Sequence, residues 1–258
     1  MLIFLAESKT MSSEQVTVST SEFIDNRPVF EADADAIMKN MSSMTSVQIS
    51  DVLDISNSLA IKCHSLAYDF PHKQTGYSTL KAFTGEAFKS FDSSSLSKEG
   101  LVRANNELRI ISSVYGLLKP SDIVKPYRCE FNKEIVPGPK TPIQLFKSKI
   151  TIEVVNYIKQ NKIQDIIDLL PGNADKCIDW KIVRAYAKVH KVVFQNIDST
   201  GKLKTPIAKR LKELRGLMAR IILEEGIQSF TELTSVESSQ FIYSPNDSKP
   251  GLPVFISA

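Results

Sequence analysis

The sequence predicts a mixed α/β (α+β) fold: a single compact domain over residues 1–258, in which helices surround a central mixed sheet. Several long segments repeat apolar residues at steps of three and four, which is the period of a helix that packs by one face. Short apolar runs bounded by Pro, Gly, Ser and Asp are typical of strands. The two kinds of element alternate irregularly, without the regular order of a doubly wound sheet and without a low-complexity linker.

The first expected element is a buried strand at residues 2–6 (LIFLA). This apolar run is too short to span a bilayer or to form a signal peptide, no basic residue precedes it, and Glu7 follows it directly. We therefore expect no membrane segment. A polar and irregular stretch is expected from residue 10 to about Val29.

Four helices are expected next, at residues 31–41, 46–55, 57–70 and 79–91. The third has the clearest apolar face, and Pro71 stops it directly after Phe70. Ser56 is its expected N-cap, because serine accepts hydrogen bonds from the first free N–H groups of a helix. Gly85 weakens the middle of the fourth helix.

Two helices joined by a short turn are expected between residues 99 and 126. A helix at 99–115 ends at Gly116, the expected left-handed residue, and Lys119-Pro120 starts a short second helix that Pro126 stops. Two helices joined in this way form a helix–hairpin–helix-like element, whose outward N–H groups suit a phosphate. The connection lacks the Gly-x-Gly core of most such elements.

The residues after these two helices have a second interpretation. Arg128 and Glu130 are two positions apart on an extended segment, so they point to the same side. They could bind and polarise a substrate, with Glu130 as general acid or base, or they could simply pair with each other. From spacing alone the simple pair is favoured.

Two further helices and several strands are expected in the second half. Thr141-Pro142 and Thr205-Pro206 each offer an N-cap followed by a first-turn proline, the first ahead of a long helix and the second ahead of a helix at 206–225. A hairpin is expected around Asp198-Ser199-Thr200-Gly201. The expected strands are 166–170, 188–197, 202–205, 240–244 and 253–257.

The cysteines and histidines indicate a cytoplasmic protein without a metal. Cys63, Cys129 and Cys177 are far apart and form no Cys-x-x-Cys pair, which is typical of reduced thiols. Cys63 is expected to pack in a helix, whereas Cys129 beside Arg128 is a candidate for a lowered thiol pKa. The histidines have no metal-ligand spacing and no nucleotide-binding motif is present, so we expect no metal and no cofactor.

Charge is distributed unevenly, because residues 1–70 are rich in acids and residues 202–220 are rich in bases. Lys209, Lys212 and Arg215 lie on one side of the expected basic helix. This ridge suits an anionic partner, or it is an ordinary solvated face. Gly216 costs roughly 1 kcal/mol relative to Ala inside a helix, so another element is expected to approach the backbone there.

A second polar group follows the first strand. Ser8-Lys9-Thr10 offers two hydroxyls and an ammonium group at the point where the strand ends. Loops at the carboxyl ends of central strands are common ligand sites, and this set suits a phosphate or a carboxylate. An ordinary surface loop is an equally good interpretation.

Together these motifs resemble the YaaA family, the bacterial peroxide stress resistance proteins. The resemblance begins at Met1-Leu2-Ile3 and Ser8-Lys9-Thr10, and continues through Phe83-x-Gly85-Glu86, Leu108-Arg109-Ile110 and Tyr115-Gly116-x-Leu118-Lys119-Pro120-x-Asp122. It is strongest at Pro126-Tyr127-Arg128-x-Glu130 and Lys212-x-x-Arg215-Gly216-Leu217-Met218-x-Arg220. The order and spacing hold over nearly the whole chain.

The resemblance implies survival under hydrogen peroxide through limited damage from intracellular iron. It also implies a positively charged cleft that binds double-stranded DNA, with a helix–hairpin–helix element at Arg109–Arg128, but no defined reaction. Two departures bear on any small-molecule site. The family's Asn-Leu-Ala-Ser reads Asp168-Leu169-Leu170-Pro171 here, and a family tyrosine is Phe88.

Two functions are favoured over a third, a scaffold that sequesters iron or a partner protein, and the sequence does not decide whether the protein is an enzyme. The first is a monomeric, cytoplasmic stress protein that binds duplex DNA through phosphate contacts from Lys9, Arg109, Lys119, Arg128, Lys212, Arg215 and Arg220. The second is an enzyme acting on a nucleotide, nucleobase or similar small anion. In the enzyme, Lys9 and Arg128 would hold the anion and Glu130 or Glu86 would be the general acid or base. Against the scaffold, the lack of a His, Cys and carboxylate ligand cluster argues against direct iron storage.

Overall fold

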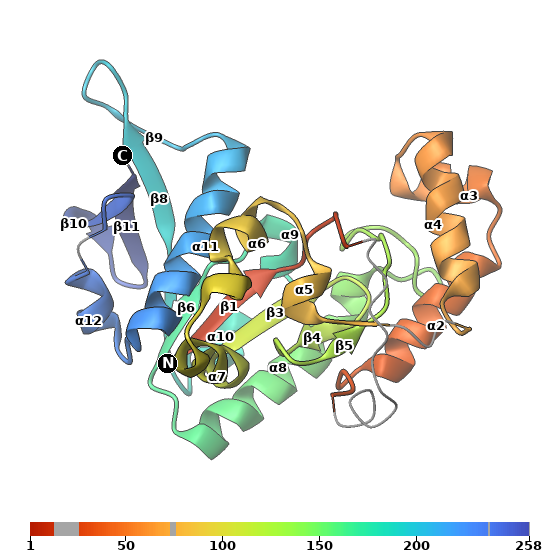
Figure 1. Ribbon diagram of the computed structural model, residues 1–258, viewed down its shortest axis with the longest axis horizontal. Coiled ribbons are helices and arrows are strands. Elements are labelled where there is room, and N and C mark those ends of the chain that lie inside the picture. The colour runs from red at the N-terminus through yellow and green to blue at the C-terminus, as the bar shows by residue number, and fades with distance from the viewer. Residues whose placement is uncertain (13–25, 73–75, 237, 258) are drawn as a thin grey trace.

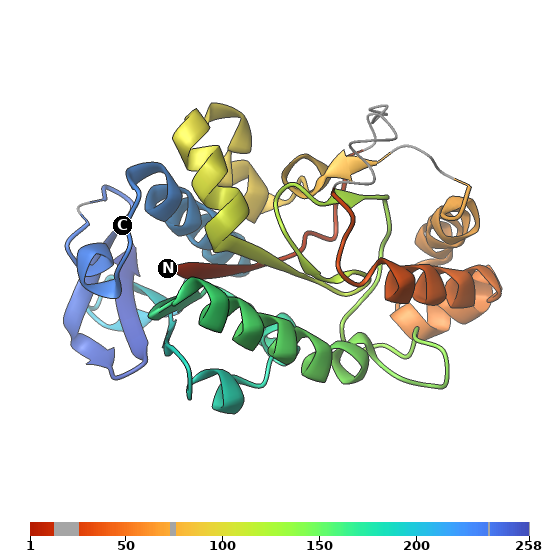
Figure 2. The same cartoon turned by 90° about the horizontal axis from the view of Figure 1, so that it is seen from below.

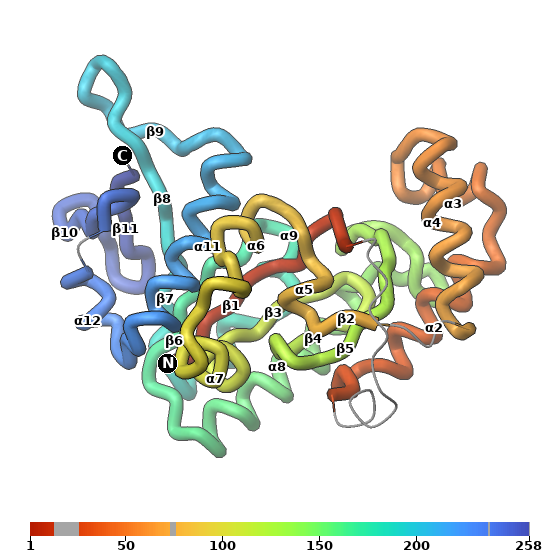
Figure 3. Tube along the Cα trace, viewed as in Figure 1, coloured from red at the N-terminus to blue at the C-terminus, as the bar shows by residue number. Residues whose placement is uncertain are grey.

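The computed structural model describes residues 1–12, 26–72, 76–236 and 238–257. Most of the irregular stretch expected before Val29 lies outside these residues. The mixed α/β fold is confirmed, since helices cover both faces of a central sheet (Figure 1). A smaller sheet lies at one end of the elongated molecule, and the helices of residues 31–69 lie at the other (Figure 3).

The central sheet has five strands in the order β4-β3-β1-β6-β7. All of them are parallel except β4, which pairs antiparallel with β3. The expected N-terminal strand is confirmed and is the central one. The chain places β3 on one side of β1 and later β6 on the other, so the strand order reverses at β1. The bounds are Leu2–Ala6 (β1), Leu108–Ser112 (β3), Gly116–Leu118 (β4), Asp165–Asp168 (β6) and Lys188–Lys191 (β7).

Long helices cover the two faces of this sheet. Helix α8 (Pro142–Asn161) lies on one face, and α7 (Lys98–Glu107) and α11 (Ala208–Glu225) lie on the other (Figure 2). Parallel connections are right-handed, so crossovers that leave β1 in opposite directions place their helices on opposite faces. Thr141 caps α8 in a capping box, as expected. Helix α11 starts later than expected, with Ile207 as its N-cap in place of Thr205.

The predicted helix at 99–115 is wrong in its second half. Helix α7 ends at Glu107, and Leu108–Ser112 form β3, in which all five residues are buried. A parallel strand that is covered on both faces carries a continuous apolar run, which fits a helical period as well as an extended one. The β-branched Ile110 and Ile111 favour the strand.

The expected helix–hairpin–helix-like element is not confirmed. Gly116 has the expected left-handed backbone, with a φ of 66°, but it follows a strand and pairs with Ser112 at the start of β4. In place of a second helix, a turn leads to β5 (Ile123–Val124), which pairs antiparallel with β2 (Tyr77–Ser78).

The first helices lie close to their expected bounds, at Glu31–Ser42 (α2), Ser46–Leu53 (α3) and Asn57–Asp69 (α4). Ser56 occupies the N-cap position of α4, although its side chain makes no capping hydrogen bond. Cys63 is buried in this helix, which confirms its expected packing role.

The predicted helix at 79–91 is divided into α5 (Thr79–Ala82) and α6 (Glu86–Phe91), with a short 3-10 turn, η1 (Ser93–Ser95), after it. Phe83 is extended between the two helices and forms a bridge with Met11. The break therefore pairs with the loop that follows β1, and Gly85 becomes the N-cap of α6.

The last third of the chain contributes a four-stranded sheet in the order β10-β11-β8-β9. The predicted strand at 188–197 is divided at Val192 between the two sheets, and the hairpin at residues 198–201 is confirmed. The expected pairing of the last two strands is also confirmed. No helix among the described residues is long and apolar enough to cross a membrane. The remaining elements are Val193–Ile197 (β8), Leu203–Lys204 (β9), Phe241–Lys249 (β10), Leu252–Ser257 (β11), Gly172–Asp175 (α9), Trp180–Val183 (α10) and Phe230–Thr234 (α12).

Candidate functional site

The carboxyl edge of the central sheet collects polar side chains from three adjacent strands. Glu7 directly follows β1, Ser113 directly follows β3, and Asp168 is the last residue of β6. Ligands of open α/β sheets bind outside the carboxyl ends of the strands, at the point where the strand order reverses. That point is β1 in this protein.

Glu7 is the centre of a hydrogen-bond network at this edge. Its carboxylate accepts hydrogen bonds from the backbone N–H of Ser113 at 3.0 Å and from the Ser113 hydroxyl at 2.5 Å. The Tyr127 hydroxyl donates to the same carboxylate and lies 2.6 Å from the Ser112 hydroxyl. The phenol and the two serines thus hold the carboxyl in one orientation.

The Glu7 carboxyl has a pKa near neutral pH. Burial raises the pKa of the Glu7 carboxyl to about 7, and the hydrogen bonds from Ser113 and Tyr127 oppose this rise. Burial and the nearby Glu7 charge raise the pKa of the Tyr127 hydroxyl well above its usual range. A carboxyl that titrates near pH 7 is suited to general acid or base chemistry. Glu7 is not among the site residues predicted from the sequence, where its one signal is an acid placed directly after a buried strand.

Lys9, Arg128 and Glu130 converge beside this network. The Lys9 ammonium lies 2.5 Å from a Glu130 carboxylate oxygen, and Arg128 Nη1 donates to the Lys9 backbone oxygen at 3.1 Å. Arg128 and Glu130 thus reach the same neighbour, as two positions on the same side of an extended segment should. Glu130 orients the Lys9 ammonium, and Arg128 fixes the backbone of the loop.

The loop after β1 is held close to the N-terminus of α6. The Ser8 hydroxyl lies 3.0 Å from the Thr10 hydroxyl and accepts from the Thr10 N–H at 3.1 Å. A side-chain Cβ at Gly85 would lie 2.2 Å from the Ser8 oxygen. Glycine at this position therefore allows the hydroxyls to approach the α6 backbone.

A second charged group lies at the end of β6. Lys191 donates to Asp168 at 2.9 Å and to Asp175 at 2.6 Å, and the Trp180 indole N–H also donates to Asp175, at 2.8 Å. Burial raises the pKa of Asp168, whereas the Lys191 charge opposes the rise. In the sequence, Asp168 stands out only as a departure from the family pattern, and Lys191 has no signal.

Arg215 faces this group without a direct partner. Burial lowers the pKa of its guanidinium and the negative charge of Asp168 opposes that shift, yet Arg215 forms no hydrogen bond or ion pair with the part of the chain that the structure describes. The close approach expected at Gly216 is present, since a Cβ there would lie 1.8 Å from the backbone oxygen of Ala87 in α6. The tight α6–α11 contact fixes Arg215 beside the sheet edge.

Other candidates on the α6 and α11 helices have different neighbours. The Glu86 carboxylate faces Lys89 at 3.1 Å and Lys209 at 3.9 Å, and its hydrogen bond with Lys89 lowers its pKa. Lys212 is exposed near Glu86. Arg220 donates to three backbone oxygens at 2.7 to 3.1 Å, those of Phe91, Asp92 and Ser95. Arg220 therefore joins α11 to the end of α6.

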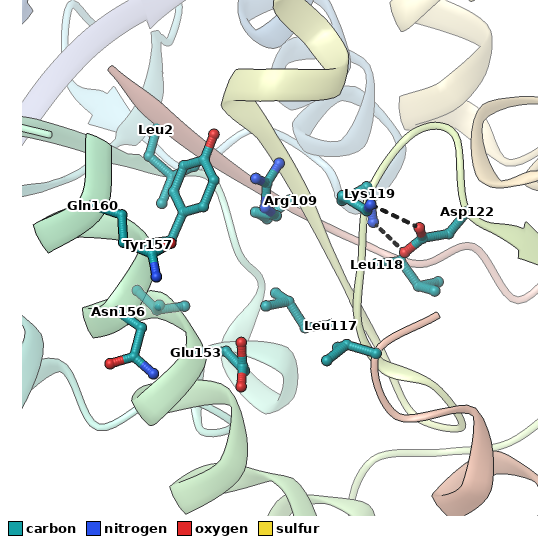
Figure 4. A pocket seen from close by; sticks show the side chains of 12 residues that line it. Leu2, Arg109, Leu117, Leu118, Lys119, Asp122, Glu153, Asn156, Tyr157 and Gln160 are labelled. Carbon is teal, nitrogen blue, oxygen red and sulfur yellow. Dashed lines mark hydrogen bonds and ion pairs between the residues drawn. The ribbon is translucent and has the colours of Figure 1, made fainter. Parts of the chain in front are cut away.

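Arg109 and Lys119 do not join the carboxyl-edge group. Arg109 is the second residue of β3, is buried, and stacks on the Tyr157 ring with 4.2 Å between guanidinium carbon and ring centroid. Lys119 lies 3.6 Å from Asp122. Both residues line a separate pocket together with Leu2, at the amino end of β1 (Figure 4).

The structure does not support the lowered thiol pKa for which Cys129 is a candidate. Its thiol is buried and contacts the Met41 sulfur at 3.1 Å. Burial, reinforced by the charge of Glu7, raises the thiol pKa well above its usual range. Among the described residues, no group of three or more His, Cys, Asp or Glu side chains is placed to hold a metal ion.

These features define a class of mixed α/β protein with a site of mixed charge at the carboxyl edge of a parallel sheet. The family described as peroxide stress protein YaaA matches residues 1–247, and the chain belongs to this family. The family assignment made from the sequence motifs is thereby confirmed.

The chain is similar to proteins named UPF0246 along nearly its whole length. A UPF0246 protein of Shewanella denitrificans is 31% identical over 260 residues, covering 99% of this chain and 98% of the relative. A UPF0246 protein of Shewanella oneidensis is 28% identical over 274 residues, with coverage of 99% and 98%. One from Aliivibrio fischeri is 28% identical over 260 residues, with coverage of 99% and 97%.

Proposed function

We propose that this peroxide stress protein binds a small anionic molecule at the carboxyl edge of its central sheet and transfers a proton through Glu7. One observation carries the proposal. A carboxyl group with a pKa of about 7 is held by Tyr127 and Ser113, next to a loop that presents Lys9. Phosphate binding alone does not require a carboxyl at this position, because a negative charge repels phosphate.

The neighbouring residues have separate roles in this proposal. Arg215, which has no direct partner among the described residues, and Lys9 hold the negative group of the ligand. Glu130 positions Lys9, because it is already engaged with the Lys9 ammonium at 2.5 Å. Tyr127 positions Glu7 and stabilises its ionised form. Glu86, paired with lysines on the surface, takes no part in the proton transfer.

A ligand-stabilisation screen tests the proposal. The melting temperature of the full chain is measured with inorganic phosphate, nucleoside mono- and diphosphates, and dicarboxylates as probes. We expect at least one anion to raise it in a saturable way, and Arg215→Gln to abolish the rise. Glu7→Gln should retain binding and lose turnover of any probe that is converted. No shift with any anion would overturn the proposal.

Duplex DNA is the second candidate ligand. Exposed Lys209 and Lys212 on α11 favour it, because they lie on the same side of the helix as Arg215. Three of the cations expected to contact DNA phosphates are not free to do so, which argues against this candidate. Arg109 is buried, Lys119 faces Asp122, and Arg220 donates hydrogen bonds to backbone oxygens.

Salt dependence separates the two ligands. A protein that neutralises several DNA phosphates loses affinity steeply between low and physiological salt. We expect a shallow dependence for a small anion at the sheet edge. A steep dependence that becomes shallower in Lys209→Ala and Lys212→Ala would establish the DNA candidate in its place.

The proposal includes a monomer that works in the cytoplasm. The buried free thiols of Cys63, Cys129 and Cys177 support a reducing compartment, since none of them is paired in a disulfide. Sedimentation of the full chain should give a mass near 28.8 kDa. Fractionation of cells that carry a tagged chain tests its location, and recovery outside the cytoplasm would contradict it.

A further inference from the structure

A second pocket lies at the opposite edge of the central sheet from the candidate site. It is bounded by the start of β1 at Leu2, the start of β3 at Arg109 and the outer turns of α8, and its volume is about 280 Å³ (Figure 4). Leu117 and Leu118 of β4 form part of its apolar wall. Drug-sized ligands occupy pockets of roughly 300–1,000 Å³, so this pocket suits a smaller molecule.

The pocket wall contains a buried carboxylate, one oxygen of which accepts no hydrogen bond. The Asp122 side chain is 2% exposed, and one of its oxygens accepts from the Lys119 backbone N–H at 2.8 Å. Its other oxygen, Oδ1, is buried without a hydrogen-bond partner, and the Lys119 ammonium lies 3.6 Å from it. Buried polar atoms are nearly always hydrogen-bonded, so an oxygen in a pocket wall whose charged neighbour lies beyond hydrogen-bond distance is a candidate acceptor for a ligand donor.

Arg109 supplies the complementary donors. It is 6% exposed, and its two hydrogen bonds, to the backbone oxygens of Asn105 and Leu108, both use Nη1. A guanidinium carries five N–H donors in a plane, so donors remain even beside the Tyr157 ring. Arg109 and Asp122 both line the pocket, and the Asp122 carboxylate pairs with Lys119 and not with Arg109.

The charges around the pocket balance. Arg109 and Lys119 are opposed by Asp122 and by Glu153 of α8. A charged ligand therefore gains little electrostatic binding energy in this pocket, in contrast to the carboxyl edge. A ligand that satisfies both walls needs an N–H donor for Asp122 next to an acceptor for Arg109, on a flat ring that fits between the leucines and Tyr157.

We propose that this pocket binds a neutral planar heterocycle with an N–H donor beside a ring acceptor, the chemistry of a free nucleobase. This site is independent of the anion site proposed at the carboxyl edge. Adenine or cytosine meets the requirement with one edge. The ligand places its donor on Asp122 Oδ1 and its acceptor on the Arg109 guanidinium.

Titration calorimetry of the full chain tests the proposal with adenine, cytosine and 1,3-dimethyluracil as probes. Dimethyluracil is a flat heterocycle without any N–H donor. We expect saturable binding of adenine or cytosine, and at least tenfold weaker binding of dimethyluracil. The absence of saturable binding by both bases, or equal binding of all three probes, would overturn the proposal.

Variants locate the site. Asp122→Asn retains an acceptor for the Lys119 N–H and should weaken base binding at least tenfold. Should that variant fail to fold, Gln160→Trp replaces an exposed residue of α8 that lines the pocket, so the indole blocks the pocket without disturbing the core. Ile152→Trp is its matched control, since Ile152 is 59% exposed on the same helix and does not line the pocket. Binding that survives Gln160→Trp unchanged would exclude this pocket, as would equal losses in both tryptophan variants.

Discussion

Tyr127 donates its phenolic hydrogen to the Glu7 carboxylate, a hydrogen bond between residues 120 positions apart in the sequence. The bond joins the end of the central strand to the segment after β5. It also gives the two residues opposite tasks: the carboxyl titrates near neutrality, while the phenol stays protonated and orients it.

Glu7→Gln should flatten the pH dependence of stability. Burial raises the pKa of Glu7 from 4.5 to about 7, so the folded protein retains a proton that the unfolded chain releases. The stability from this group is full below the unfolded pKa and is lost as the pH rises through the folded one. Glutamine does not titrate. We measure the free energy of unfolding with urea at several pH values. From about pH 5 to pH 8 this free energy should fall by up to about 3 kcal/mol less in the variant than in the wild type.

Tyr127→Phe should raise the pKa of Glu7 further. The Tyr127 hydrogen bond lowers this pKa, and its loss removes a donor from the ionised carboxylate. The variant should also lose about 1–3 kcal/mol of stability, because Ser112 and Glu7 lose a buried partner. Carbon-13 NMR titration of the Glu7 carboxyl measures the first effect. Tyr186→Phe, at a ring that is 46% exposed, is the control and should leave the titration unchanged.

Gly216→Ala should destabilise the protein although alanine is the better helix former. The propensity gain is about 1 kcal/mol. The new Cβ would lie 1.8 Å from the Ala87 backbone oxygen, so α6 and α11 must move apart, and we expect a net loss of about 2 kcal/mol or more. Gly172→Ala is the matched control, because nothing lies within 4 Å of its added Cβ. Equal unfolding midpoints for the two variants would contradict the tight contact.

Arg215 and Arg220 should separate ligand binding from stability. Arg220→Gln removes hydrogen bonds to three backbone oxygens and should cost roughly 2 kcal/mol or more, with anion binding retained. Arg215→Gln removes a largely buried cation without a direct partner in the described chain, so the stability should change by less than about 1 kcal/mol. Its anion binding should be lost. Denaturant unfolding measures the change in stability, and the melting-shift screen measures the change in anion binding.

The sequence predicts well those elements whose ends are set by a few capping or turn residues. The capped start of α8 at Thr141 and the hairpin near Asp198 depend on a few adjacent residues, and both were located correctly. Leu108–Ser112 was assigned to a helix, because burial on both faces removes the alternation that marks a strand.

The candidate site depends on contacts between distant segments. The motifs identified Lys9, Arg128 and Glu130, and the structure brings these three together. Glu7 was missed, because its raised pKa depends on burial and on partners that follow more than 100 residues later in the chain. Its position directly after a buried strand is the one local feature that distinguishes it from a surface acid.

The central position of β1 has a consequence for biosynthesis. Leu2 lies beside Ile166, so β1 acquires its second neighbour only after about 160 further residues have been made. At roughly 5–20 residues per second that interval is on the order of ten seconds or more. Until then, LIFLA is an apolar segment with an unpaired edge, which makes nascent chains of this protein natural clients for a chaperone.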